Sequence, residues 1–469
     1  MIRTLSLPSF RVFRRTAGAV LLGLLLSSTL EVKAAGDNQL DEKISTELQK
    51  LQPFVDAKNW DGALGLINSL KPLAAADSYD QAVLSDITYK IYMQKSDYQK
   101  AIAPLEEAIR LADTYNYFDA NQTQEMVLYL AQVYYQEAVG NKSKALQQQY
   151  YAKAIFYMQR WIKASDKPKT DSSYQDAMTL YATLLYQQAT MKEPADAALI
   201  AEAQKVIHEA LLTVIHPKDT YYVMLLASYQ QQNDLVKSAE LLEFLAKNYP
   251  SRKDYWQQLF GTYLNLAGNQ KDEETARMYN IRAILTIERA QAKGLMEGPK
   301  DYMNLVSIYF TIGQFGKAIE VLHKGLKDGT IEQVQKNWEL LAYSYQQINQ
   351  PLNAVNVLKE ATQRFPRSGQ LDYQIAQIYY SLDNTQETYN SLKLALAKGN
   401  LEKAGSVSGF LAYVCFELRK FDEALAAATK ALASPDTKSD AQLPKLKQAI
   451  EDSIKEREAT AESLKKKTK

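Results

Sequence analysis

The stretch from Gln335 to Ser368 restricts what this chain can fold into more than any other part of it. Its apolar residues recur at offsets of three, four and seven, which places them on one side of a helix. They are Trp338, Leu341, Ala342 and Tyr345 in the first half, and Ala354, Leu358 and Ala361 in the second. Asn349-Gln350-Pro351 separates the halves, and Pro366 ends the pattern because proline cannot continue a helix interior. The stretch therefore predicts two helices that fold back on each other across a short turn.

The same pattern recurs in about ten approximate units, from a first unit that begins near Ile44 to a tenth that reaches Ala431. The seventh to tenth units are the clearest, and the first and fourth are the most degenerate. In the tenth unit Cys415 occupies the position that tyrosine holds in most of the others. Glycine (18) and proline (13) are scarce among the 469 residues, and no window shows sustained strand alternation. The sequence therefore predicts an all-α protein.

These units resemble the tetratricopeptide (TPR) repeat, a 34-residue helix–turn–helix with W-x2-L-G-x2-Y…A-x3-F…P positions. Ala342 stands where the family has glycine. The resemblance implies a right-handed α-solenoid over residues 35–438, in which successive units build one continuous core. Residues 439–469 carry apolar residues at helical spacing and are expected to form a C-terminal capping helix followed by a frayed, charged tail. Those apolar residues are Leu443, Leu446, Ile450 and Ile454.

Two units contain an insertion. In the third and sixth units the expected alanines, Ala154 and Ala283, come eleven residues late, which is about three helical turns. Gly140-Asn141 and Gly268-Asn269 lie where the turn between the helices is expected. We therefore predict two lengthened hairpins that project from the array. They are either tolerated drift at a surface turn or docking projections, because insertions in repeat arrays map to one face.

Residues 1–34 have the pattern of a secretory signal peptide. Basic residues precede an apolar run from Ala17 to Leu26, and Val32-Lys33-Ala34 provides a small-residue cleavage motif. The alternative is a membrane anchor, but a spanning helix needs about 20 apolar residues and this run is shorter. No cysteine lies close behind the run, so lipoprotein processing is not expected. We predict cleavage after Ala34 or Ala35, a periplasmic location and no transmembrane segment in the mature chain.

The charge and motif content argue against several functions. Residues 1–34 carry a net charge of +4, and removing it from the formal +1 of the whole chain leaves −3, with no basic field for nucleic acid. The three histidines, His208, His216 and His323, have no metal-ligand spacing, and phosphate-binding and nucleophile-elbow motifs are absent. Cys415 is expected to be a small packing residue, with a reactive thiol as the alternative. We expect no enzyme activity, cofactor or metal.

In TPR proteins the first helix of each unit lines a concave groove, and this resemblance implies a set of partner-binding residues. They are Phe310, Tyr343, Gln346, Gln347, Tyr373, Gln377, Tyr380, Tyr413 and Phe416. Glutamine can donate to and accept from a peptide backbone, and tyrosine adds apolar area with a polar tip. The alternative is that the glutamines only favour helix and the tyrosines pack between helices. The Lys/Asn/Arg set that clamps a C-terminal carboxylate is absent.

The sequence thus favours a protein-interaction scaffold whose partner is a protein or peptide. The array, with its Tyr-Trp-Gln-Gln-Leu-x-x-x-Tyr run at Tyr255 to Tyr263, resembles periplasmic TPR proteins that accompany TonB–ExbB–ExbD systems. That resemblance implies association with inner-membrane energy-transduction proteins. The alternatives are an envelope-assembly or glycan-binding factor, with peptidoglycan or an exopolysaccharide in the groove, and an enzyme.

Overall fold

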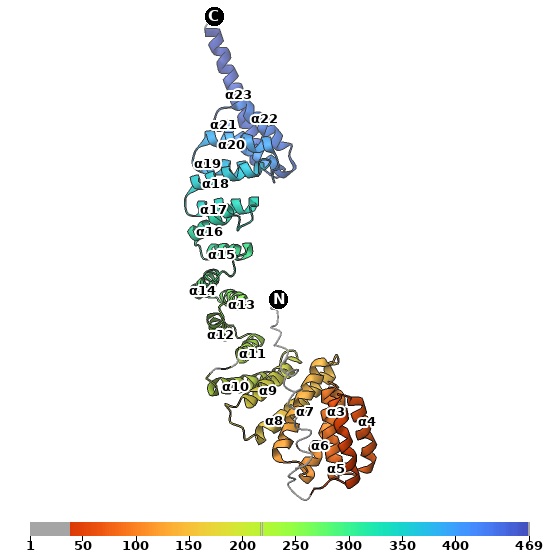
Figure 1. Cartoon of the computed structure of the whole chain (residues 1–469). Coiled ribbons are helices and arrows are strands. Elements are labelled where there is room, and N and C mark those ends of the chain that lie inside the picture. The colour runs from red at the N-terminus through yellow and green to blue at the C-terminus, as the bar shows by residue number, and fades with distance from the viewer. Residues whose placement is uncertain (1–37, 216, 218, 468–469) are drawn as a thin grey trace. The chain divides into compact units, whose positions relative to one another are not determined.

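The computed structural model describes residues 38–215, 217 and 219–467, and these residues form helices joined by turns. The predicted signal peptide at residues 1–34 and His216 lie outside the described residues. The chain divides into two compact units, residues 1–245 and 246–469, and each is considered by itself. Within each unit the helices follow in chain order as antiparallel pairs (Figure 1).

The first unit opens with short helical segments and continues with long pairs. Its elements are α2 Glu42–Leu48, η1 Gln49–Leu51, α3 Gln52–Asp56, α4 Trp60–Leu70, η2 Lys71–Leu73, α5 Tyr79–Gln94, α6 Tyr98–Tyr115, α7 Ala120–Gly140, α8 Lys144–Ala164, α9 Ser172–Thr190, α10 Ala197–Thr213, α11 Asp219–Gln231 and α12 Leu235–Asn248, the last of which reaches into the second unit.

The second unit is more regular, and most of its helices have 12–16 residues. They are α13 Lys253–Gly268, α14 Glu273–Gln291, α15 Pro299–Thr311, α16 Phe315–Asp328, α17 Gln335–Gln347, α18 Pro351–Arg364, α19 Gly369–Ser381, α20 Thr385–Lys398, α21 Ala404–Glu417, α22 Phe421–Leu432, η3 Pro435–Thr437 and α23 Gln442–Lys467. The predicted fold class, an all-α array of about ten TPR-like hairpins with a C-terminal helix, is confirmed.

The turn inside most hairpins of the second unit has one recurring geometry. Its central residue has a left-handed backbone, as in Gly313 (φ 69°), Asn349 (φ 56°) and Asp383 (φ 58°), whereas the lengthened α13–α14 hairpin turns without one. The amide of the next residue donates to the carbonyl five positions back, for example Gln350 N to Tyr345 O at 2.9 Å. This is the six-to-one bond of a Schellman motif, which satisfies a carbonyl at the end of the first helix. The turn thereby sets where the tyrosine position of each unit lies.

That tyrosine position carries a polar contact between successive hairpins. Its side chain reaches the second helix of the preceding unit, where the partner differs at each step. The tyrosine hydroxyl lies 3.4 Å from His208 for Tyr229, 3.0 Å from Glu288 for Tyr309, 3.4 Å from His323 for Tyr345 and 3.0 Å from Lys359 for Tyr379. Each contact places a hydroxyl at the rim of the apolar core, where it can hydrogen-bond both to a side chain of the neighbouring hairpin and to water.

In the tenth hairpin Cys415 replaces that tyrosine and is fully buried. Tyr389 from α20 packs against the same core and donates to Glu423 of α22 at 2.8 Å. The Lys420 ammonium lies 3.5 Å from the centre of the Tyr389 ring. Burial raises the pKa of the Cys415 thiol to about 11. This supports the interpretation of Cys415 as a packing residue, and Tyr389 provides the interhelical hydroxyl that Cys415 cannot.

The two insertions lengthen their helices. The α7 and α8 helices have 21 residues each, and α13 and α14 have 16 and 19, against 13 and 14 in the neighbouring pair α15 and α16. Gly140 and Gly268 are the last residues of α7 and α13, so both Gly-Asn pairs lie at the hairpin turns as predicted. Whether these hairpins dock a partner stays a prediction.

The C-terminal helix α23 covers the last hairpin. Leu443 and Ile450 are buried, and Leu446 and Ile454 pack at the edge of the core that α21 and α22 form. Arg457 extends the contact through a two-pronged hydrogen bond to Asp422 at 2.9 and 3.0 Å. The charged segment that we expected to fray continues as helix to Lys467. Among the described helices none is both long and apolar enough to cross a membrane.

Candidate protein-binding face

The candidate site lies on the outward side of the first helices of four hairpins, α15, α17, α19 and α21, all in the second unit. The inward sides of these helices carry buried residues such as Leu305, Leu341, Ile375 and Leu411, which hold the helices in register. The opposite, outward side of each helix carries the residues that lie between these buried ones in the sequence. We call it the aromatic face and define it as the residues of 303–311, 339–347, 373–381 and 409–417 that are not buried.

All nine predicted residues lie on this side, and none of them is buried. Tyr343 and Tyr413 are 47% and 42% exposed. Gln346, Gln347 and Gln377 are exposed, whereas Phe310, Tyr373, Tyr380 and Phe416 are half-buried. Tyr343 and Tyr413 are thus not packed fully between helices, and whether the nine residues bind a partner stays a prediction. Tyr373 comes nearest to such packing, because it packs against the core of the last hairpins and burial raises its pKa.

One ring cluster lies at the α15–α17 end of the aromatic face. The rings of Phe310 and Tyr343 stack at 6.0 Å with an interplanar angle of 24°. Phe315, the first residue of α16, meets both rings edge-on at 5.2 and 6.4 Å. These contacts fix the Tyr343 ring and leave its outer side in water.

A second ring cluster joins α19 to α21. Tyr380 meets Phe410 edge-on at 5.1 Å and Tyr413 edge-on at 6.2 Å. Hydrogen bonding to Tyr413 and desolvation, with a smaller effect of Glu417, raise the pKa of Tyr380 to about 12. Phe416 packs against Phe421 at 5.9 Å at the end of the same helix. Tyr413 is thus held from one side, as Tyr343 is in the first cluster.

Phe315, Phe410 and Phe421 are members of these clusters that the sequence analysis did not assign to the site. Phe410 was detectable, because it precedes Tyr413 by three residues and shares its side of the helix. Phe315 and Phe421 begin the second helices α16 and α22, so their contact with a first-helix ring depends on the turn geometry. Helical spacing alone cannot reveal such a contact.

The aromatic face is almost free of charge. The four segments that carry it contain two carboxylates, Glu339 and Glu417, and no lysine, arginine or histidine. At the edge of the α17 segment Lys336 is exposed, seven residues before Tyr343 and on the same side of the helix. The Gln335 side-chain amide donates to Glu339 at 2.8 Å, and Glu417 interacts with Tyr380. The face therefore offers mainly apolar area, hydroxyls and amides, with Lys336 at the edge of its α17 segment.

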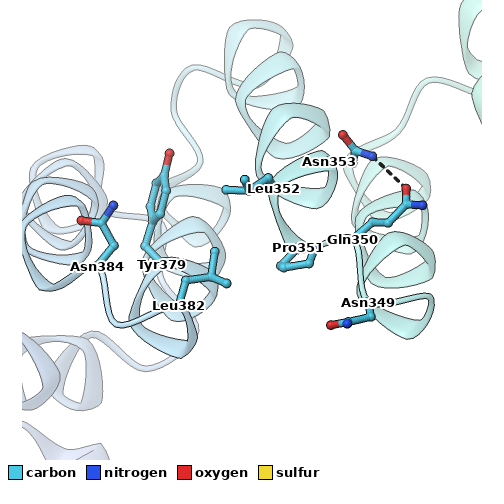
Figure 2. A pocket seen from close by; sticks show the side chains of 8 residues that line it. All are labelled: Asn349, Gln350, Pro351, Leu352, Asn353, Tyr379, Leu382 and Asn384. Carbon is cyan, nitrogen blue, oxygen red and sulfur yellow. Dashed lines mark hydrogen bonds between the residues drawn. The ribbon is translucent and has the colours of Figure 1, made fainter.

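A hollow of about 490 Å³ lies beside this face, between the α17–α18 turn and the α19–α20 turn. Figure 2 shows Asn349, Pro351 and Leu352 from one turn and Tyr379 and Leu382 from the next hairpin around it. None of the nine predicted residues lines it. No group of three or more metal-ligating side chains occurs in the part of the chain that the structure describes.

Hairpins of this geometry, several with Schellman turns and a tyrosine at the joint to the preceding hairpin, define a helical repeat fold of the tetratricopeptide type. No family model matches the chain, and no curated protein matches it either. Solved structures with partial similarity include crystal structures of MamA (20% identity, 36% of this chain and 88% of that chain, TM-score 0.29) and of the APC/C hetero-tetramer Cut9-Hcn1 (15%, 87% and 77%, 0.26). Another is MamA from Desulfovibrio magneticus RS-1 (14%, 39% and 97%, 0.28). Scores this low carry no argument about overall arrangement, so the class rests on this chain's own hairpins.

Proposed function

We propose that the protein is an exported scaffold that binds an extended, uncharged segment of a partner protein along the aromatic face. The observation that carries this proposal is the pair of outward tyrosines, Tyr343 and Tyr413, each held on one side by neighbouring rings and open on the other. Rings already fixed by packing lose little entropy when a partner covers them.

The residues between the two ring clusters suit a peptide backbone. Gln346, Gln347 and Gln377 are exposed, and each amide can donate to one backbone group and accept from another. The scarcity of cationic side chains argues against nucleic acid and strongly acidic ligands. A partner segment with apolar side chains and few charges fits this combination best.

The cellular context of the proposal comes from the sequence. The signal-peptide pattern of residues 1–34 supports export to the periplasm, and the resemblance to TPR proteins that accompany TonB–ExbB–ExbD systems suggests which partners to test first. We therefore propose TonB and ExbD as the initial probes.

The experiment places a photo-crosslinking amino acid at Gln377, in the middle of the aromatic face, and at Tyr115, which lies in the other unit. Crosslinking to TonB or ExbD from Gln377 but not from Tyr115 supports the proposal. The affinity of the captured protein is then measured for Tyr343→Ala with Tyr413→Ala. Removing two aromatic anchors, each worth about 2 kcal/mol, should weaken binding at least tenfold.

Tyr115→Ala is the matched control, because Tyr115 is 43% exposed, as much as the two anchors. It should leave affinity unchanged. Equal affinities for the anchor variant and the control would remove the aromatic face from consideration as the binding site.

A glycan ligand is the second candidate, because the same exposed rings and amides could stack on and hydrogen-bond to sugars. Co-sedimentation of the protein with insoluble peptidoglycan, and its loss in the Tyr343→Ala/Tyr413→Ala variant, would favour this function over the protein partner. Retention of the variant in the pellet would argue against it.

A further inference from the structure

The second helix of the sixth hairpin, α14, has apolar residues on two sides. Its inner side is buried through residues such as Ala283, Ile284 and Ile287. On its outer side Met278, Ile281 and Leu285 are 40%, 40% and 47% exposed. Their offsets of three and seven form a single stripe. A helix that packs on one side needs only one apolar stripe, so the outer one is unexplained by the fold.

The arginines along one edge of this stripe turn back onto the protein. The Arg282 guanidinium lies 5.8 Å from the centre of the Tyr263 ring, and that of Arg289 lies 5.1 Å from the Trp256 ring. Both rings belong to α13. Cations held over aromatic faces keep a favourable interaction when water is removed.

The charged side chains along the opposite edge of the stripe also contact the protein itself, in this case α15 and its C-terminal end. Arg277 Nη1 donates to the carbonyl of Ile312 at 2.7 Å, and Glu288 accepts from the Tyr309 hydroxyl at 3.0 Å. The charged side chains on both edges thus contact their own chain, and the large apolar side chains face outward. A second surface can cover the stripe without leaving these charges unpaired.

The other second helices of this unit differ. Among the described residues of the second unit, α16 and α22 expose no large apolar side chain, and α18 and α20 expose one each, Leu352 and Leu394. Among the second helices of this unit, an outer stripe of three large apolar side chains is therefore particular to α14. It also belongs to one of the two hairpins that carry an insertion.

We propose that the α14 stripe pairs with the α14 stripe of a second copy of the chain, the two helices running antiparallel. Glu273 and Glu274 lie at the start of α14, and Arg289 and Lys293 lie at or just beyond its end. Antiparallel pairing brings acidic starts to basic ends, whereas parallel pairing brings like charges together. The stripe is also complementary to itself, since Met278 of one copy then faces Leu285 of the second copy and Ile281 lies near the two-fold axis.

The size of the stripe sets the strength of this dimer. Stable interfaces bury about 800 Å² on each partner, and three half-exposed side chains supply only part of that area. The dimer is therefore a weak one that forms with rising concentration and separates on dilution.

Cysteine crosslinking tests the geometry. A two-fold contact brings residue 281 of both copies together, so Ile281→Cys should form an interchain disulfide under mild oxidation. The native Cys415 is buried and does not compete. Leu352→Cys, at an exposed position on another second helix, is the control and should stay monomeric. Met278→Cys with Leu285→Cys should crosslink better than Met278→Cys alone, as antiparallel pairing requires.

Sedimentation velocity over a concentration series tests the association itself. Wild-type protein should show a monomer–dimer equilibrium. Ile281→Asp should weaken association at least tenfold, because it places two carboxylates at the axis, and Leu352→Asp should leave it unchanged. Circular dichroism should show the same helicity in all three proteins. A wild type that stays monomeric up to its solubility limit, or equal crosslinking of Ile281→Cys and Leu352→Cys, overturns the proposal.

Discussion

Trp338 shows how one side chain ties a hairpin to its surroundings. It is buried, and the Arg364 guanidinium lies 5.0 Å from the centre of its ring. Trp338→Ala should cost about 3–5 kcal/mol, because it removes a large core side chain and leaves a cavity. Each repeat contacts only its neighbours, so hydrogen exchange should accelerate in α17, α18 and the adjoining helices. Tyr343→Ala, on the exposed side of α17, should cost less, about 0.5–1.5 kcal/mol, because it removes only the ring contacts with Phe310 and Phe315. Uniform acceleration over the second unit would contradict a linear array.

The thiol of Cys415 should react very slowly in the folded protein. Burial raises its pKa from 9.0 to about 11, so at pH 8 the folded chain holds about a hundredfold less thiolate than an exposed cysteine. The rate of labelling by a thiol reagent should rise about tenfold per pH unit and become fast only on unfolding. Rapid labelling of native protein at pH 8 would show that the side chain is accessible.

At the scale of elements, the hairpin turn can be tested with one chemical change made at two positions. Gly313 has φ 69° and open space around it, so Gly313→Ala should destabilise the seventh hairpin by about 1 kcal/mol through backbone strain alone. Gly316 lies three residues on, in helical backbone with equally open space, and Gly316→Ala should stabilise by roughly 0.5 kcal/mol. Thermal unfolding of both variants measures the signs. Equal effects would mean that the turn does not need its left-handed residue.

The helices and their pairing into hairpins were the features that the sequence predicted best. Spacing identified the hairpins, the insertions at Gly140 and Gly268 and the C-terminal helix, because a helix that must bury one side repeats its apolar residues every three to four positions. The outward placement of Tyr343 and Tyr413 followed from the same period. The pairing of rings across hairpins could not be predicted from this period. The hydrogen bond of Tyr389 to Glu423, beside Cys415, could not be predicted either. Both depend on how one helix is rotated against another, which a single-helix pattern does not encode.

At the scale of the whole molecule, buried tyrosine hydroxyls make the free energy of unfolding sensitive to high pH. Burial is the largest cause that raises the pKa of Tyr151, Tyr157 and Tyr181 to about 12 each. An unfolded chain ionises its tyrosines near pH 10, and the folded chain keeps these three protonated, so the unfolded state binds fewer protons and stability falls as pH rises above about 10. The melting temperature should be level from pH 7 to 9 and decline steeply beyond 10. A level melting temperature up to pH 11 would show that these hydroxyls are free to ionise in the folded state.

The near absence of charge on the aromatic face has a kinetic consequence. An uncharged ligand that approaches this face is not steered by the charges of the protein, so its association rate constant should lie near the unsteered value of about 10⁵–10⁶ M⁻¹s⁻¹. Added salt, which screens only charges, should leave that rate nearly unchanged. Discrimination between ligands then depends on how slowly each one leaves. If the proposed binding at the aromatic face holds, residence time on Tyr343 and Tyr413 is the quantity that selects the partner.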